Sequence, residues 1–370
     1  MKTLLAISCF LTTALMAEQP MQCCRISKQC CPETFNPCGL TYGFYGEFLY
    51  LQPNGTDLFY GATAVGISPT SSGDGFSLAS IASPDWTVLE IQPDYHSGFE
   101  VGVKLASNNN HITINLNWER LHAVDSNSYS ASADIGHMVG PFFDIGPNSA
   151  AYKIATGKAT SHFDAVNLTF GKNLCFFNNF HTELYGAAAF ARIKQTLLST
   201  YSNFSGSISR AVETDSTFTG AGPQVGLNYD YRIHSGFFFS GNSTLSLLVG
   251  QMKNATTYQS VTPELATIGL SSPNNQATTI PNRTQLVPAF EQKLGFSWIS
   301  TWKSTQATFA FGYQCQLYLD AIQVFNMASQ AIPTDLVDVS PDVAVYAVAF
   351  EQTNSNFILS GPYVFLGFEF

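Results

Sequence analysis

Hydrophobic and polar residues alternate with a period of two along most of the chain after residue 40. In the segment 112–118 the apolar positions Ile112, Ile114, Leu116 and Trp118 are separated by Thr and Asn. A helix would place apolar residues three and four positions apart, so this alternation predicts a β-strand. The same pattern occurs at 99–105, 225–231, 290–298 and 307–317, and more weakly at 42–52, 162–172, 181–195, 235–250, 343–350 and 357–370.

The predicted strands have about 9 to 12 residues, the length that crosses a bilayer when a strand is tilted. Their apolar faces would point inward in a soluble β-sandwich and outward to lipid in an outer-membrane barrel, so the period alone leaves both open. Charged residues make up only 11% of the chain, against about 25% in an average soluble protein, and this favours the barrel. Eleven strands are recognisable, whereas bacterial barrels have an even number. We therefore expect an all-β fold, a transmembrane antiparallel β-barrel of 12–16 strands, with further strands within 53–95 or 319–341.

Short and long connections alternate between the predicted strands. The short ones lie at 108–110, 174–180, 233–235, 300–304 and 352–356. The long ones, rich in Ser, Thr, Asn, Gly and Pro, cover about 53–95, 121–161, 196–215, 251–286 and 319–341. Short periplasmic turns and long external loops are typical of bacterial barrels, so we expect residues 42–370 to form the barrel.

The N-terminus has the features of a secretory signal peptide over residues 1–17. Lys2 is followed by the apolar segment 4–15 and by the small residue Ala17. This apolar segment is too short to anchor a helix in a membrane. Export would place residues 18–41 in the periplasm as a cysteine-rich segment.

Cysteines of exported proteins tend to form disulfides. The candidates are Cys23, Cys24, Cys30, Cys31 and Cys38, and Cys175 in a predicted periplasmic turn. Cys315, in contrast, falls on the apolar face of a strand, where we expect a free thiol. A zinc site is the alternative for the cluster, but its spacing lacks the usual C-x2-C pair, so we expect no metal.

The polar faces of the strands would line the lumen of the barrel. The expected pore-lining residues are Glu100, Lys104, Asn115, Asn117, Glu119, Asp230, Arg232, Glu291 and Lys293. Near the proposed outer mouth, the stretches 53–95 and 319–342 hold nine acidic residues and no Lys or Arg. Such a ring would favour cations, although the acids could equally serve only to solvate a surface.

The chain ends on an aromatic residue preceded by apolar residues at every second position. Val364, Leu366, Phe368 and Phe370 share one strand face. This pattern resembles the signal that bacterial barrel-assembly machinery reads, and we interpret these four residues as that signal.

Several strand motifs resemble those of one protein family. The segment Tyr42–Leu51, the stretches 97–102 and 114–122, and the segments 222–228 and 242–250 resemble Legionella-type major outer membrane proteins, a family that includes porins of Chlamydia-like bacteria. The resemblance implies a multi-pass protein of the bacterial outer membrane, surrounded by its lipid. It also implies passive diffusion of small hydrophilic solutes and ions, which the acidic mouth would give a weak cation preference.

Other interpretations remain open beside the porin. The cysteine cluster departs from the simple family pattern, and the resemblance to chlamydial envelopes implies disulfide cross-links to other envelope proteins or to copies of itself. The chain could instead be a non-conducting adhesin or structural envelope protein. A secreted soluble β-sandwich is the third alternative. Porins commonly form trimers, and a homotrimer is therefore open.

Enzymatic and nucleic-acid functions have little support in the sequence. The chain contains no G-x-S-x-G, H-E-x-x-H, Walker-type or C-x2-C motif, and its seven histidines are scattered. The formal net charge of −10 argues against nucleic-acid binding, which needs basic stripes. We expect no enzyme, no cofactor and no nucleic-acid partner.

Overall fold

The computed structural model describes residues 40–55, 58–65, 86–107, 112–131, 137–140, 152–177, 179–202, 208–260, 274–302, 305–333 and 343–370. The predicted signal peptide and the cysteines at 23–38 lie outside these residues. All regular elements in the described residues are β-strands. No helix among them is long and apolar enough to span a membrane.

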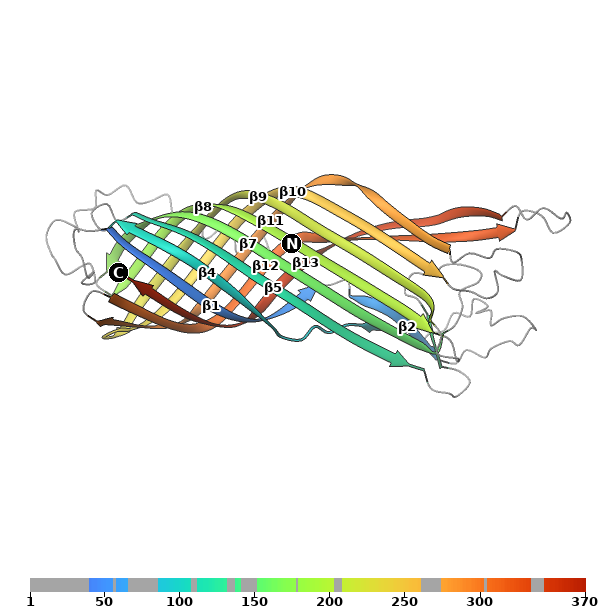
Figure 1. Cartoon of the computed structure of the whole chain (residues 1–370), viewed down its shortest axis with the longest axis horizontal. Helices are drawn as coiled ribbons and strands as arrows, with labels where there is room; N and C mark the ends of the chain where they lie inside the picture. The colour runs from blue at the N-terminus through green and yellow to red at the C-terminus, as the bar shows by residue number, and fades with distance from the viewer. Residues whose placement is uncertain are drawn as a thin grey trace, which may run out of the picture.

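Ten antiparallel strands form a closed barrel (Figure 1). Successive barrel strands pair with each other, and the first pairs with the last as well as with β4, which leaves the barrel without an edge. The predicted all-β antiparallel barrel with an even number of strands is thereby confirmed. The ten strands are β1 (Leu40–Gly55), β4 (His96–Ser107), β5 (Ile112–Ser130), β7 (Ile154–Phe177), β8 (Phe180–Ser202), β9 (Ile208–His234), β10 (Phe237–Ser260), β11 (Asn274–Trp302), β12 (Thr305–Pro333) and β13 (Val343–Glu369).

The predicted range of 12–16 strands is too high. The segments 343–350 and 357–370, expected to be two strands, are both parts of β13. The polar residues between them were interpreted as a turn, but Thr353, Asn354 and Ser355 pair in register with β12. Because the barrel is closed with ten strands, it needs no further strand from 53–95 or 319–341.

Most barrel strands are also longer than the sequence pattern indicates. Strands β7 to β13 have 23 to 29 residues each, whereas a tilted strand crosses a bilayer with about 9–11. The predicted long loops at 121–161, 196–215, 251–286 and 319–341 are therefore shorter than expected. The polar residues in these segments indicate that water, and not lipid, surrounds this part of the strands. The strands continue there because pairing with a neighbour on each side supplies the hydrogen bonds of the backbone in water as well as in lipid.

Three short strands form a second sheet beside the barrel wall. β2 (Phe59–Val65) lies between β3 (Trp86–Glu90) and β6 (His137–Gly140). Tyr60 of β2 is fully buried, and a Cβ added to Gly157 of β7 would lie 2.5 Å from its ring. The Tyr201 hydroxyl of β8 donates a hydrogen bond to the Tyr60 carbonyl. The small sheet thus packs on β7 and β8, and Figure 1 shows β2 at the end of the barrel opposite the C-terminus.

The C-terminal strand is tied to the first strand at the other end. The backbone amides of Phe370 and Tyr42 each donate to the carbonyl of the other residue, at 2.9 and 3.2 Å. The Tyr42 and Phe370 rings are stacked, with centroids 5.7 Å apart. Val364, Leu366 and Phe370 are exposed on the outer surface. Val364, Leu366 and Phe368 alternate along β13, and Phe370 follows directly after its end. Whether assembly machinery recognises these four residues stays a prediction.

Candidate functional site: the barrel interior

An apolar belt surrounds the end of the barrel that carries the short hairpins. Exposed apolar side chains alternate with inward polar ones along every strand there, as in Leu116 and Trp118 of β5 against Asn115 and Asn117. This is the pattern of a lipid-facing barrel wall. Further exposed members of the belt are Phe44, Phe48, Val101, Val166, Leu168, Phe170, Phe190, Val225, Leu245, Val249, Phe290, Phe296, Phe309, Phe311 and Leu366.

At the outer edge of this belt the apolar residues move from the outward face of the strands to the inward face, which we call the phase change. On β5, apolar residues point outward up to Trp118, but Leu121 points inward and is only 2% exposed. The neighbouring strands change at the same register, because Leu121 pairs with Phe163, which pairs with Ile193. An inward row across five neighbouring strands results, and each member is at most 2% exposed: Leu121, Phe163, Ile193, Phe218 and Met252.

This row belongs to an apolar core that fills the interior beyond the belt. Phe163 lies across the lumen from β12 and β13, with its ring centroid 5.5 Å from Tyr318 and 6.1 Å from Phe357. Leu49 and Leu359 are fully buried in the same cluster. Apolar side chains of facing walls are therefore in contact, as in the interior of a soluble protein.

At the level of the belt the interior is closed by a polar network around Lys293 of β11. Its ammonium lies 3.0 Å from Glu47 of β1, 2.8 Å from Glu100 of β4 and 3.8 Å from Glu291 on its own strand. Glu47 and Glu100 are 6% and 5% exposed. One cation thus joins strands on opposite walls of the barrel, and its removal would leave buried carboxylates without a counter-ion.

Two further groups of hydrogen bonds connect strands that are not neighbours at this level. Gln316 donates to both carboxylate oxygens of Glu119, at 3.0 and 2.8 Å, and Gln314 donates to one of them. Since Glu119 is on β5 and the glutamines are on β12, these bonds connect strands that are not neighbours. On the other side, the Tyr185 hydroxyl contacts Thr244 at 2.7 Å and accepts from Asn242.

All nine residues expected to line the lumen lie on the inner face of the barrel. Their side chains contact one another and other inward side chains, so they occupy the lumen. Asn117 donates to Glu100 at 2.7 Å, and Asn115 donates to the Tyr45 hydroxyl, which itself contacts Glu100. At the hairpin end, Lys104 pairs with Glu369 at 2.8 Å, and the Arg232 guanidinium lies 5.5 Å from the Phe238 ring centroid. Asp230 occupies the register position opposite Ser240.

A small cavity of about 20 Å³ lies between the polar network and the apolar core. Glu119, Gln224, Glu291 and Tyr318 are among the residues that line it. This volume holds about one water molecule.

Comparison with known families agrees with this architecture. The model of the family described as Legionella pneumophila major outer membrane protein precursor matches residues 37–370. The chain belongs to this family. The resemblance predicted from its strand motifs is thereby confirmed, and this member of the family is an outer-membrane β-barrel protein.

Solved structures offer more distant likenesses. The outer membrane protease OmpT from Escherichia coli shares 11% identity with this family member, covers 91% of this chain and 99% of its own, and has a TM-score of 0.41. A FadL homologue from Pseudomonas aeruginosa shares 5% identity over 90% of each chain, with a TM-score of 0.21. Scores this low transfer neither activity nor ligand to this chain. The sequence matches no curated protein.

Among the cysteines of this family member, Cys315 is half-buried and is a free thiol in the described part of the chain, as expected. Cys175 was predicted in a turn, but it lies within β7 and pairs with His181 of β8. The predicted turn at 174–180 is shorter because β7 continues to Phe177.

The proposed acidic mouth lies largely outside the described residues. Of its nine acids, Glu90, Asp94 and Asp320 are described. The Asp94 amide donates to the Asp125 carboxylate at 2.9 Å, and His96 contacts the same oxygen at 2.9 Å. These bonds fasten the start of β4 to β5. Among the described residues, no group of His, Cys, Asp or Glu could hold a metal ion.

The change of apolar face and the apolar core that it creates were not predicted from the sequence. The signal is present in β5, where the apolar positions are even-numbered up to Trp118 and the next two, Leu121 and Ala123, are odd-numbered. An assignment of a single face to each strand hides such a change.

Proposed function

We propose that this protein is a non-conducting structural barrel of the outer membrane that anchors a long extracellular β-extension. The observation that supports this function is the filled interior, with a Lys293-centred network at the level of the belt and an apolar core beyond it. Barrels with few strands have interiors narrow enough for side chains to fill, and ten strands are close to that limit.

The passive, weakly cation-selective porin is the competing function. The polar inner face of the belt supports it, because all nine expected lining residues point inward there. The row from Leu121 to Met252 argues against it, since a buried apolar layer is a barrier to ions and hydrophilic solutes.

The amino-terminal cysteines would extend the structural role through disulfide cross-links to other envelope proteins or to further copies. The cysteine cluster directly precedes β1, whose start pairs with the end of β4 at the hairpin end of the barrel. Envelope preparations run without reductant should then contain multimers that collapse to monomers on reduction. Monomers under both conditions would argue against cross-linking.

Single-channel recording in a planar bilayer tests the closed interior. The refolded full chain should give no discrete conductance steps. A hollowed variant, F163A/Y318A/F357A, removes three contacting core rings. Combined with E47A and K293A, which remove the polar closure at the belt, it should conduct if it retains its heat-dependent mobility on gels. The variant F170A/F309A, which truncates two lipid-facing rings, is the matched control and should stay silent. Regular steps from the unmodified protein, with a cation-favouring reversal potential, would establish the porin instead.

A further inference from the structure

A basic patch lies on the outside of the barrel, directly beyond the apolar belt on three neighbouring strands. We define the patch as Arg120 and His122 of β5, His162 of β7, and Arg192 and Lys194 of β8. Each strand presents its last belt residue, Trp118, Val166 or Phe190, immediately before the patch. These three belt residues pair with one another, so the change from apolar to charged occurs at one register across all three strands.

The first row of the patch is organised around Asp164. This carboxylate is opposite Arg120 on one side and opposite Arg192 on the other. Arg120 lies 3.7 Å from it and is half exposed, with a side-chain exposure of 51%. Arg192 is exposed and forms no ion pair within the part of the chain that the structure describes. One carboxylate thus faces two guanidinium groups, and both of these side chains are exposed. A guanidinium carries five N–H donors, more than one carboxylate can use.

The second row contains two stacked histidines and a lysine. The His122 and His162 rings are 4.2 Å apart between centroids, and their Nδ1 atoms are 3.0 Å apart. Lys194 is opposite His162 and lies 3.5 Å from Asp215. Burial, and then the neighbouring His122 and Lys194, lower the pKa of His162, which disfavours the charged form of this ring. The permanent cations of the patch are therefore Arg120, Arg192 and Lys194.

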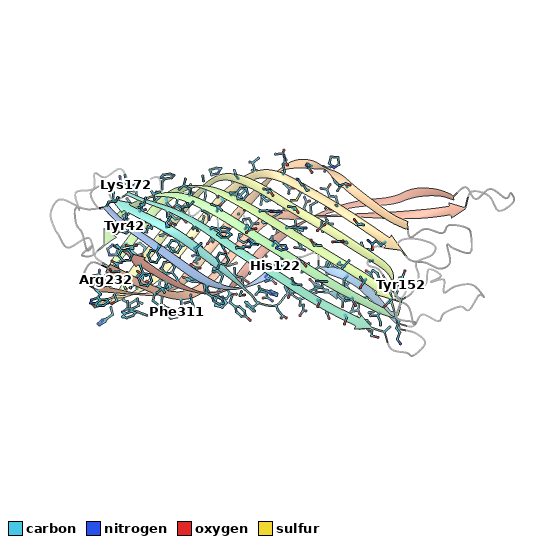
Figure 2. All side chains as sticks on the ribbon, in the orientation of Figure 1. Tyr42, His122, Tyr152, Lys172, Arg232 and Phe311 are labelled. Carbon is cyan, nitrogen blue, oxygen red and sulfur yellow. The ribbon has the colours of Figure 1, made fainter. Side chains whose placement is uncertain are left out.

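The position of these cations indicates their ligand. The chain has a net charge of −10 and only 16 Lys and Arg residues, yet three of them gather on adjacent strands at the edge of the belt. Side chains just outside the hydrocarbon region lie at the level of lipid headgroups. The patch is on the side of the belt away from the C-terminus and the short hairpins, and Figure 2 shows His122 midway along the barrel and Lys172 near the hairpin end. It therefore faces the outer leaflet.

We propose that the basic patch binds the phosphate groups of lipid headgroups in the outer leaflet of the outer membrane. Neighbouring strands are about 4.8 Å apart and side chains two positions apart on a strand are about 7 Å apart, so the patch spans about 10 Å by 7 Å. This area accommodates one or two phosphates. Guanidinium groups bind phosphate through two parallel hydrogen bonds, which Arg120 and Arg192 are free to form on their exposed sides. This inference is independent of whether the barrel conducts.

Native mass spectrometry of the full chain in neutral detergent, titrated with lipid A, tests the proposal. Each basic residue near a membrane surface contributes about fivefold to affinity for anionic lipid, so R120Q/R192Q/K194Q should bind lipid A about a hundredfold more weakly. The variant K172Q is the matched control, because Lys172 is exposed on β7 at the opposite edge of the belt. It should bind lipid A as the unmodified protein does. The heat-dependent gel mobility of each variant verifies that it is folded.

Two further probes separate the lipid from other sources of phosphate. Lipid A from which the phosphates have been removed should bind only weakly to the unmodified protein. Its affinity should equal that of intact lipid A for the triple variant. Inorganic phosphate alone should compete only at millimolar concentration. Equal binding of lipid A to the triple variant and the unmodified protein would overturn the proposal, and so would equal affinity for inorganic phosphate and lipid A.

Discussion

The two halves of this barrel are built with opposite polarity, although the same strands pass through both. At the hairpin end the outer surface is apolar and the interior holds the Lys293 network. Beyond the belt the outer surface carries Arg120 and Lys194, and the interior holds Phe163 and its neighbours. The solvent outside explains the inversion. Lipid accepts apolar side chains on the outer wall, whereas water drives them into the lumen.

This comparison teaches that a strand's apolar face depends on what surrounds each part of it. A closed barrel supplies all backbone hydrogen bonds in either solvent, so the strand itself continues without interruption across the membrane boundary. Only the side-chain phase has to change, and it does so within the residues Glu119 to Leu121 on β5. The half at the hairpin end, called the lower half below, is held together by buried charges. The half beyond the belt, called the upper half, is held together by apolar packing.

The largest effect is expected in the lower half, for Lys293→Met. The substitution leaves Glu47, Glu100 and Glu291 buried together without their cation, which should lower the free energy of unfolding by about 3–5 kcal/mol. Urea titration of the refolded protein measures this value. The double variant K293M/E100Q should recover part of the loss, because one unpaired carboxylate is gone. A midpoint unchanged by Lys293→Met would mean that the network does not hold the walls together.

In the upper half, Phe163→Ala should cost about 3 kcal/mol, because the ring is fully buried between facing walls and leaves a cavity. Phe170→Ala removes the same ring from the same strand on the lipid side, where the side chain is 52% exposed. The loss there should be clearly smaller, since detergent or lipid fills the space. Equal losses in urea titrations of the two variants would contradict the phase change on β7.

The smallest effect is expected at the hairpin end, for Lys104→Gln. The Lys104–Glu369 pair is about one third exposed on both sides, so its loss should cost less than about 1 kcal/mol. The cost should also fall as salt is added, since solvent-exposed pairs are screened. Urea titrations at low and high salt measure both quantities. A loss of stability as large as that of Lys293→Met would mean that the difference in solvent exposure between Lys104 and Lys293 does not determine how much each ion pair stabilises the barrel.

Much of the fold follows from local sequence pattern. The alternation at 112–118 and 307–317 identifies barrel strands because side chains on a strand necessarily alternate between two faces. The same rule places Glu100, Asn117 and Lys293 on the inner face, and the strand motifs predict the family. These features depend only on residues close together in the chain.

The number of strands and the state of the lumen depend on partners that are distant in the chain. Residues 353–355 have the composition of a turn, but β12 holds them in a continuous strand, and this pairing reduces the count to ten. Glu47 and Lys293 are 246 residues apart, and no local pattern indicates that they meet. The sequence by itself determined which faces of the strands are apolar at the hairpin end of the barrel and to which family the chain belongs. The tertiary structure decided that the inward side chains meet and close the interior, because the distance between opposite walls follows from closure of the barrel at a particular strand number and stagger.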